Sequence, residues 1–468
     1  MNFADISWML VCSALVLLMT PGLAFFYGGM VQKKNVISTM FQSYISMALM
    51  TILWFTVGFS LSFGESIGGI IGNPFTYPLM NGVVGAPNWS LAPTIPLLLF
   101  AFFQLKFAII TPALITGAFA ERIKFFSYLI FITLFSIFIY CPLAHMTWHP
   151  DGILFKLGVL DFAGGTVVHM SAGVAALACA VVLKPRIEQV TNPSRVTYVL
   201  LGAGLLWFGW IGFNGGSALA ANETAVLASF NTTLASAAAM ISWLIMDWDR
   251  GKKPSAVGAA IGAVVGLVAI TPAAGYVSIA EAFSIGIISA AISNIAVHFR
   301  SKSGLDDTLD VFPSHGIGGI VGMILTGVFA DNGKFWVQTL SMAGVFVYVY
   351  IMTILLLKLT NRIIPMNLDA NDQKLGLYEV YGDKKEDLVE NISEKEEDDE
   401  KKLVIEENST QTEPELMWED YMHPEFPWHN RAKWINNPKA VNYWMSNKGG
   451  TVRDLAKIRN EEENIKTY

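Results

Sequence analysis

The sequence predicts an all-α polytopic membrane protein with eleven transmembrane helices. Hydrophobic residues make up 53% of the 468 residues and charged residues only 15%, and the mean hydropathy is +0.46. These values are far from those of an ordinary soluble domain. A span needs about 20 apolar residues to cross the hydrocarbon core. Stretches of this kind are predicted at 7–30, 36–62, 94–119, 125–145, 164–183, 196–216, 225–247, 255–272, 279–297, 311–329 and 335–359.

The positive charges predict the orientation of these spans. One set of alternate loops carries most of the Lys and Arg residues, whereas the other set holds only Lys156 and Lys334. By the positive-inside rule, the basic loops are cytoplasmic. The N-terminus is therefore expected outside and, after eleven spans, the C-terminus inside. The first span has no basic residue before it and is followed by Lys33 and Lys34, so it is interpreted as a retained helix.

Two histidines lie inside predicted spans, each a short distance after an aspartate. His169 follows Asp161, and His315 follows Asp310. Ionisable side chains at membrane depth are rare and usually functional, so this matched pair indicates a pore. The pair occupies the fifth and tenth spans, which cross in opposite directions. We therefore expect an inverted five-helix repeat plus one extra helix, with the site at the repeat interface.

The composition changes sharply after Pro365. Beyond it lie 14 basic and 24 acidic residues, a net charge of −10. We therefore expect a transmembrane domain at 1–362, a cytoplasmic segment at 363–390 and an acidic tail at 391–468. Residues 394–402 are nearly all charged and are predicted to form a solvated linker. The aromatic residues that follow predict either a small docking element or a weakly packed tail: Trp418, Tyr421, Phe426, Trp428, Trp434, Tyr443 and Trp444.

Five motifs in order carry a resemblance to a known family. They are Pro21 to Gly29, Gly117 to Arg122, Asp161 to His169, Trp207 to Ser217 and Asp310 to Gly319. The chain resembles the ammonium transporter family (Amt/Mep/Rh), and most closely its Amt branch, from about residue 5 to residue 383. The resemblance implies a homotrimer in the plasma membrane, with one pore per subunit conducting ammonium or ammonia. It implies no enzymatic activity, no cofactor, no metal and no nucleic-acid partner.

The family's external vestibule would be formed here by Phe103, Phe107, Trp148 and Ser217. Phe103 and Phe107 are four residues apart and share a helix face. An ammonium ion over aromatic faces gains about 0.5–2 kcal/mol. Ammonium donates hydrogen bonds, which an alkali cation cannot do, and Ser217 offers an acceptor. The resemblance therefore implies selection of ammonium over potassium.

Phe107 and Phe213 match the family's stacked pore gate, and His169 and His315 match its twin pore-lining histidines. A bare cation cannot readily cross an apolar conduit, because desolvating it is costly, whereas neutral ammonia can. The resemblance thus implies deprotonation near the vestibule and passage of ammonia along the imidazoles. Asp161, eight residues before His169, would stabilise the cation-receiving end or anchor a helix end. Taken singly, each of these aromatic residues and histidines would be an ordinary core residue.

Two positions depart from the family pattern. Lys106 lies mid-span beside Phe107, where an uncharged residue is usual. Helical geometry rotates it about 100° away from Phe107, so we expect it to face a neighbouring helix or subunit and to bond a carbonyl or carboxylate. In the segment 368–378, which resembles the family's regulatory segment, Tyr378 replaces the usual aspartate. This segment is expected to dock on inner loops, and a cytoplasmic regulator of the PII type and membrane lipid are the expected partners.

Two other functional classes compete with transport. A sensor that binds ammonium and signals through its tail is the main alternative, favoured by the long aromatic tail and by Lys106. An intramembrane metal enzyme would use His145, His149 and Asp151 with the twin histidines. No nucleophile and no His-Glu-x-x-His motif accompanies these residues, so the sequence disfavours this alternative.

Overall fold

The computed structural model describes residues 1–189, 193–376 and 438–447. The chain divides into two units, Met1–Asp383 and Lys384–Tyr468, each described by itself. In the second unit the described part is helix α19 (Pro438–Asn447), which contains Tyr443 and Trp444. Tyr378, the linker at 394–402 and the remaining tail aromatics lie outside the described residues. The predictions about them therefore stay predictions.

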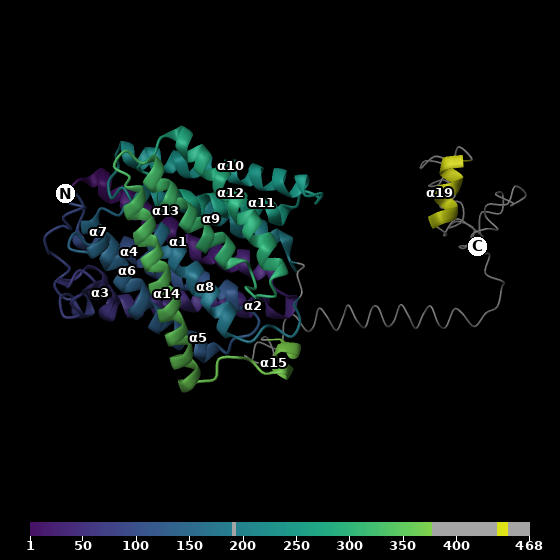
Figure 1. Ribbon diagram of the computed structural model, residues 1–468, viewed down its shortest axis with the longest axis horizontal. Helices are drawn as coiled ribbons and strands as arrows, with labels where there is room; N and C mark the ends of the chain where they lie inside the picture. Colours follow the sequence, from purple (N-terminus) through teal and green to yellow (C-terminus); the bar gives the residue numbers. More distant parts are fainter. Residues whose placement is uncertain (190–192, 377–437, 448–468) are drawn as a thin grey trace, which may run out of the picture. The chain divides into compact units, whose positions relative to one another are not determined.

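The first unit is a bundle of apolar helices packed side by side (Figure 1). Within the described ranges, ten helical stretches are long and apolar enough to cross a membrane, and the shorter apolar helix α11 (Ala256–Ile270) lies among them. Ten of these eleven stretches agree with predicted spans to within five residues at each end, whereas Phe125–Leu157 runs twelve residues beyond the predicted 125–145. The polytopic helical membrane fold is confirmed, whereas the eleven-span count, the orientation and the trimer remain predictions.

The first five stretches run from residue 3 to residue 182. Several are built from consecutive helical pieces because π-helical turns interrupt them. In chain order the elements are α1 (Phe3–Met30), η1 (Lys33–Asn35), α2 (Val36–Leu53), η2 (Trp54–Gly58), α3 (Phe59–Phe63), β1 (Ser66–Ile67), β2 (Ile71–Gly72), η3 (Pro78–Met80), α4 (Leu97–Phe119), α5 (Phe125–Phe135), η4 (Ser136–Tyr140), α6 (Cys141–Trp148), α7 (Ile153–Leu157), η5 (Gly165–Met170) and α8 (Ser171–Val182). The strands β1 and β2 form a short antiparallel hairpin.

The remaining described elements of this unit run from residue 196 to residue 375. They are α9 (Val196–Gly216), α10 (Glu223–Asp249), α11, α12 (Ile279–Lys302), η6 (Phe312–Gly316), α13 (Ile317–Phe329), α14 (Phe335–Ile363) and α15 (Ala370–Leu375). The first and sixth membrane stretches, α1 and α9, pack along one another over much of their length. This pairing is consistent with the expected repeat.

The two histidine-bearing stretches cross at a point of very close approach. A Cβ atom added to Gly173 in α8 would lie 2.1 Å from the backbone nitrogen of Gly316 in η6. Any side chain there would force the two backbones apart, so glycine permits the contact. Because His315 precedes Gly316 directly and His169 lies one turn before Gly173, this crossing brings the two imidazoles together.

Candidate functional site

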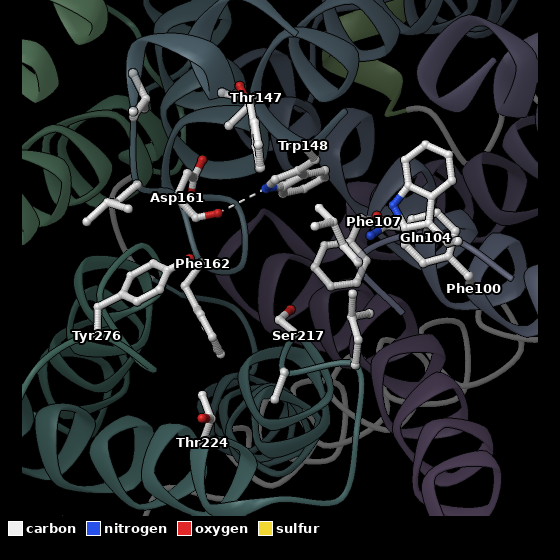
Figure 2. A pocket seen from close by; sticks show the side chains of 18 of the residues that line it. Phe100, Gln104, Phe107, Thr147, Trp148, Asp161, Phe162, Ser217, Thr224 and Tyr276 are labelled. Atoms are coloured by element: carbon white, nitrogen blue, oxygen red, sulfur yellow. Dashed lines mark hydrogen bonds between the residues drawn. The ribbon is translucent and has the colours of Figure 1, made fainter. Parts of the chain in front are cut away.

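A cavity of about 440 Å³ lies at one end of the bundle and is lined by most of the predicted vestibule residues. Phe107 reaches it from α4, Trp148 from the end of α6 and Ser217 from the residue after α9. Asp161 lies across the cavity from Phe107 (Figure 2). Four segments far apart in the sequence thus converge on one hollow.

Two polar groups of this cavity have hydrogen bonds that fix their orientation. The Ser217 hydroxyl donates to the Phe213 carbonyl at 2.8 Å, which leaves its oxygen lone pairs free to accept. The Trp148 indole donates to the Asp161 carbonyl at 3.0 Å, and this bond holds the ring at the cavity wall (Figure 2). A site with aromatic faces and hydroxyl acceptors suits a small cation that carries hydrogen-bond donors.

Phe103 and Gln104 differ from the sequence-based expectation. Phe103 is not among the cavity-lining residues; it is fully buried and packs edge-on against Phe107 with ring centroids 5.0 Å apart. Its direct contact with a substrate remains a prediction. Gln104 does line the cavity, and its Oε1 has no hydrogen-bond partner in the described structure. The signal for Gln104 was available, since it lies three residues before Phe107 on the same helix face.

Below the cavity, Phe107 and Phe213 close the way to the bundle interior. Their ring centroids are 4.3 Å apart, and both side chains are almost fully buried. Phe213 also contacts His169, at a centroid distance of 5.8 Å. The path therefore leads from the cavity to the two phenyl rings, which are tilted by 39° to each other, and then to the first imidazole.

The two histidines lie side by side behind the phenyl rings. His169 and His315 have ring centroids 5.5 Å apart and Nδ1 atoms 3.4 Å apart. A hydrogen bond between two Nδ1 atoms requires one ring to donate and the other to accept, and two neutral imidazoles in opposite tautomers satisfy this requirement. The Nε2 atom of His169 has no partner in the described part of the chain. The pair can therefore bond a small neutral molecule without carrying a fixed charge.

Asp161 anchors the first histidine segment. Its carboxylate accepts the backbone N–H groups of Gly164, Gly165, Thr166 and Val167 at 2.6–3.3 Å. These are the free donors at the beginning of η5, and an anion there is stabilised by the helix dipole. Residues 161–164 are not helical, so Asp161 lies just before the first turn of η5. The geometry favours the anchoring role over a free charge at the cavity.

The counterpart of Asp161 in the second histidine segment is Asp307, not the predicted Asp310. Asp307 precedes His315 by eight residues, the spacing between Asp161 and His169, and its Oδ2 accepts the Phe312 backbone N–H at 2.7 Å. Asp310 instead pairs with Arg300 at 2.6 Å. Burial raises the pKa of Asp307 to about 7.

The comparison with known proteins supplies the family. The family profile described as Ammonium Transporter Family matches residues 7–385. The chain belongs to the ammonium transporter family. Among ammonium transporter relatives, a protein named "Ammonium transporter" from Aquifex aeolicus is 48% identical over 71% of this chain and 78% of its own length. One of the same name from Bacillus subtilis is 42% identical over 82% of this chain and 98% of its own length.

Solved structures in the ammonium transporter family share this fold. The crystal structure of Saccharomyces cerevisiae Mep2 superposes with a TM-score of 0.75 at 36% identity, over 79% of this chain and 88% of that one. A structure titled "Sensor Amt Protein" gives a TM-score of 0.76 at 30% identity, over 81% of this chain and 98% of that one.

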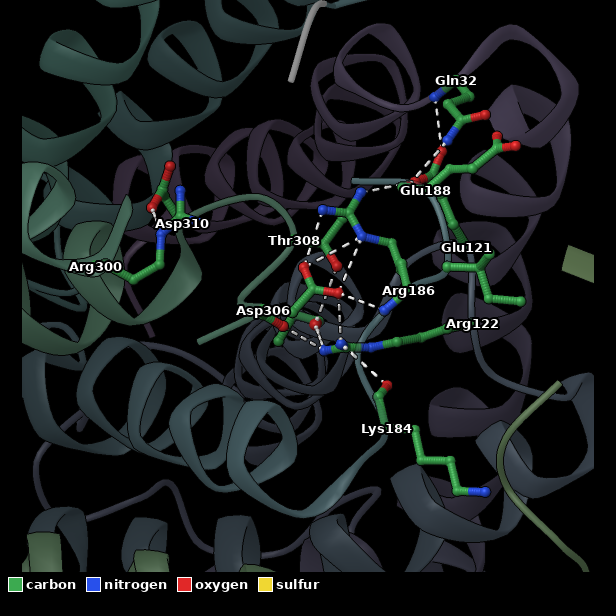
Figure 3. Close-up of polar contacts among 12 residues, drawn as sticks. Gln32, Glu121, Arg122, Lys184, Arg186, Glu188, Arg300, Asp306, Thr308 and Asp310 are labelled. Atoms are coloured by element: carbon green, nitrogen blue, oxygen red, sulfur yellow. Dashed lines mark hydrogen bonds and ion pairs between the residues drawn. The ribbon is translucent and has the colours of Figure 1, made fainter. Parts of the chain in front are cut away.

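At the other end of the bundle, this ammonium transporter family member carries a buried ionic network (Figure 3). Asp306 lies between Arg122 and Arg186, at 2.8 and 2.9 Å, and Arg186 also pairs with Glu121 at 2.7 Å. Burial alone would raise the pKa of Asp306, but hydrogen bonds from Arg186 and the charge of Arg122 hold it below the ordinary value. The network ties loops after α4, α8 and α12 together.

The chain after α14 returns to these same loops. The backbone N–H of Lys124 donates to the Met366 carbonyl at 2.9 Å, and that of Leu368 donates to the Arg122 carbonyl at 3.0 Å. Further along, the Gln373 side chain accepts the Ile187 backbone N–H at 3.2 Å. The first part of the predicted regulatory segment therefore docks on loops of its own protomer.

The histidines of the competing metal-enzyme hypothesis are not arranged as metal ligands. His145 bonds the Ser62 carbonyl through Nδ1 at 3.0 Å and the Ser66 hydroxyl through Nε2 at 2.8 Å. His149 stacks on His145 and accepts the Asp151 backbone N–H. Over the residues that the structure describes, no group of three or more His, Cys, Asp or Glu side chains could hold a metal ion.

Proposed function

We propose that this protein transports ammonium across the cell membrane and carries it through the pore as ammonia. One observation carries the proposal: an aromatic cavity is separated from a pair of buried imidazoles by two phenyl rings in close contact. Family membership supports the substrate, since relatives of 42–48% identity are named ammonium transporters.

The arrangement assigns a step to each group. Trp148, Phe107 and Ser217 recruit ammonium, the two aromatic rings through cation–π attraction and the hydroxyl through a hydrogen bond. Past the gate of Phe107 and Phe213, the buried surroundings penalise a charge, so the proton leaves and ammonia continues. His169 and His315 bond ammonia in passing, because neutral imidazoles offer both a donor and an acceptor.

Further features of the proposal concern assembly and topology. We propose eleven spans with the N-terminus outside, an inverted five-helix repeat with one extra helix, and a homotrimer with one pore per subunit. The two histidine segments support the repeat, because each begins with a π-helical turn that an aspartate anchors. These segments are η5 with α8 and η6 with α13. A cytoplasmic regulator of the PII type remains an expected partner.

The vestibule assignment is tested by removing one recruiting group at a time. We expect Trp148→Leu and Ser217→Ala to raise the half-saturating ammonium concentration by about three- to thirtyfold, as expected for a loss of roughly 0.5–2 kcal/mol. Uptake into proteoliposomes measures this. Thr233→Ala, an exposed position on α10 outside the cavity lining, is the matched control and should stay near wild type. Unchanged half-saturation in both vestibule variants would contradict the assignment.

A sensor remains the second candidate, favoured by the likeness to the structure titled "Sensor Amt Protein". Growth of a transport-deficient cell on limiting ammonium distinguishes the two. Rescue by this chain supports transport, and a signalling response without rescue supports the sensor.

The tail contacts predict a graded response to truncation. Ending the chain after Pro365 removes the bonds from Met366, Leu368 and Gln373 to the inner loops, so we expect a folded assembly with altered uptake. Ending it after Glu390 keeps these contacts and should change basal uptake little. Size-exclusion chromatography and vesicle uptake measure both properties. Equal loss of assembly in the two truncations would refute the regulatory assignment.

A further inference from the structure

Lys106 is a buried cation in the middle of α4, one residue before the gate residue Phe107. Its side chain is 4% exposed, and none of the described carboxylates pairs with it within the ion-pair limit of 4.0 Å. The described part of this protomer therefore supplies no carboxylate partner, and a partner from a neighbouring subunit stays a prediction. Instead, its Nζ lies 3.6 Å from the centroid of the Phe102 ring.

The Phe102 contact indicates that Lys106 keeps its charge. A ring face attracts an ammonium group electrostatically within about 6 Å but offers little to a neutral amine. Phe102 is 42% exposed whereas Lys106 is 4% exposed. The ring rather than the amine therefore forms the outer surface of α4 at this point, and it covers the cation.

This charge lies close enough to the gate to act on it. Adjacent helical residues differ by about 1.5 Å in height and 100° in direction, so the Lys106 and Phe107 side chains leave neighbouring faces of α4 at almost the same height. The space between them is filled by buried protein, where salt and water screen charges poorly. The Asp161 carboxylate lines the same cavity as Phe107, and its oxygens are bound by four backbone N–H groups of its own segment.

We infer that Lys106 is a specificity-determining residue: a fixed positive charge beside Phe107 that disfavours any cation at the gate and leaves neutral ammonia unaffected. The inference rests on the proposed transport function. The cavity attracts ammonium through its aromatic faces and acceptors, while Lys106 opposes entry of the charged form one step deeper. Ammonium, potassium and sodium all meet this opposition, and ammonia does not.

The test compares a variant that lacks the Lys106 charge with one that keeps it. Lys106→Met keeps the length and apolar stem but removes the charge, and Lys106→Arg keeps the charge. In proteoliposomes we expect Lys106→Met to lower the half-saturating ammonium concentration about three- to tenfold, with maximal uptake preserved or raised, as for loss of a nearby repulsive charge. Inhibition by potassium should strengthen in the same variant. Lys106→Arg should stay near wild type in both measurements.

Three results would overturn the inference. An equal half-saturating ammonium concentration and equal potassium inhibition in wild type and Lys106→Met would show that the Lys106 charge has no effect at the gate. Equal changes in Lys106→Met and Lys106→Arg would show a packing effect instead. Abolished uptake in a Lys106→Met protein that assembles normally would place Lys106 in the pathway itself.

Calorimetric titration of the purified proteins with ammonium chloride separates this inference from the proposed function. Tighter ammonium binding to Lys106→Met than to wild type and Lys106→Arg supports the charge effect even where vesicles show no uptake. Equal binding in all three contradicts it. Absence of uptake by wild-type vesicles, in contrast, contradicts the transport function alone.

Discussion

Replacing His169 or His315 by Asp is expected to preserve assembly and to alter substrate selectivity or abolish transport. The imidazoles form a neutral pair whose Nδ1 atoms are 3.4 Å apart. A carboxylate at either position removes this hydrogen bond and introduces an acceptor-only negative charge. Hydrated cations are then attracted to a path that otherwise rejects them. If the imidazoles relay the proton, transport is lost instead.

Bilayer currents with ammonium and with potassium measure this change. We expect a potassium current in the Asp variants that wild type lacks, or else an ammonium current reduced at least about tenfold, as for removal of a positioned proton-transfer group. His298→Asp, a histidine near the end of α12 and outside the cavity lining, is the matched control and should leave both currents unchanged. Ammonium current and potassium discrimination unchanged in both pore variants would remove His169 and His315 from the mechanism.

The second large effect is expected at Asp306. Its side chain is 2% exposed and pairs with Arg122 and Arg186, whose side chains are 1% and 8% exposed. Asp306→Asn leaves two buried guanidinium groups without their shared anion, and breaking a buried pair costs about 3–5 kcal/mol. The free energy of unfolding should fall by that amount, and the loops that receive the Met366 and Leu368 contacts should loosen.

Thermal unfolding of purified protein measures the loss. We expect the apparent Tm of Asp306→Asn to fall by roughly 5–10 °C, given the stability cost and the size of the unit. Asp151→Asn is the matched control, because the Asp151–Lys156 pair has both side chains 59% exposed and exposed pairs contribute little. A fall of the same size in both variants, or in neither, would show that the buried network does not hold the inner loops together.

The helices were predictable from the sequence because their signal is local. Each span needs a run of apolar residues of bilayer length, and such runs are visible in one sequence. The predicted stretch 196–216 agrees with α9 (Val196–Gly216) at both ends. The π-helical turns η5 and η6 were not predicted. A π-helix joins residues five apart by hydrogen bonds and an α-helix residues four apart, and a short apolar segment has no periodicity that distinguishes the two.

The site was predictable only in part, because chain spacing does not determine contacts. Asp306, Asp307 and Asp310 lie within five residues, and the sequence alone could not tell which of them anchors η6. The structure assigns Asp307 to the anchor, Asp306 to the arginine network and Asp310 to Arg300. The ring partner of Lys106 was missed for a related reason. Carboxylates and carbonyls are the usual partners of a buried lysine, whereas Phe102 lies one turn away on the same helix.

The central claim is that the paired phenyl rings and the imidazoles, in their neutral form, pass ammonia while excluding cations. Its most direct test is flux through the wild-type protein in proteoliposomes exposed to ammonium or to an equal concentration of potassium. The account predicts saturable, ammonium-dependent uptake with no potassium flux. Equal permeation of ammonium and potassium, or no ammonium uptake by vesicles that hold folded protein, would contradict it.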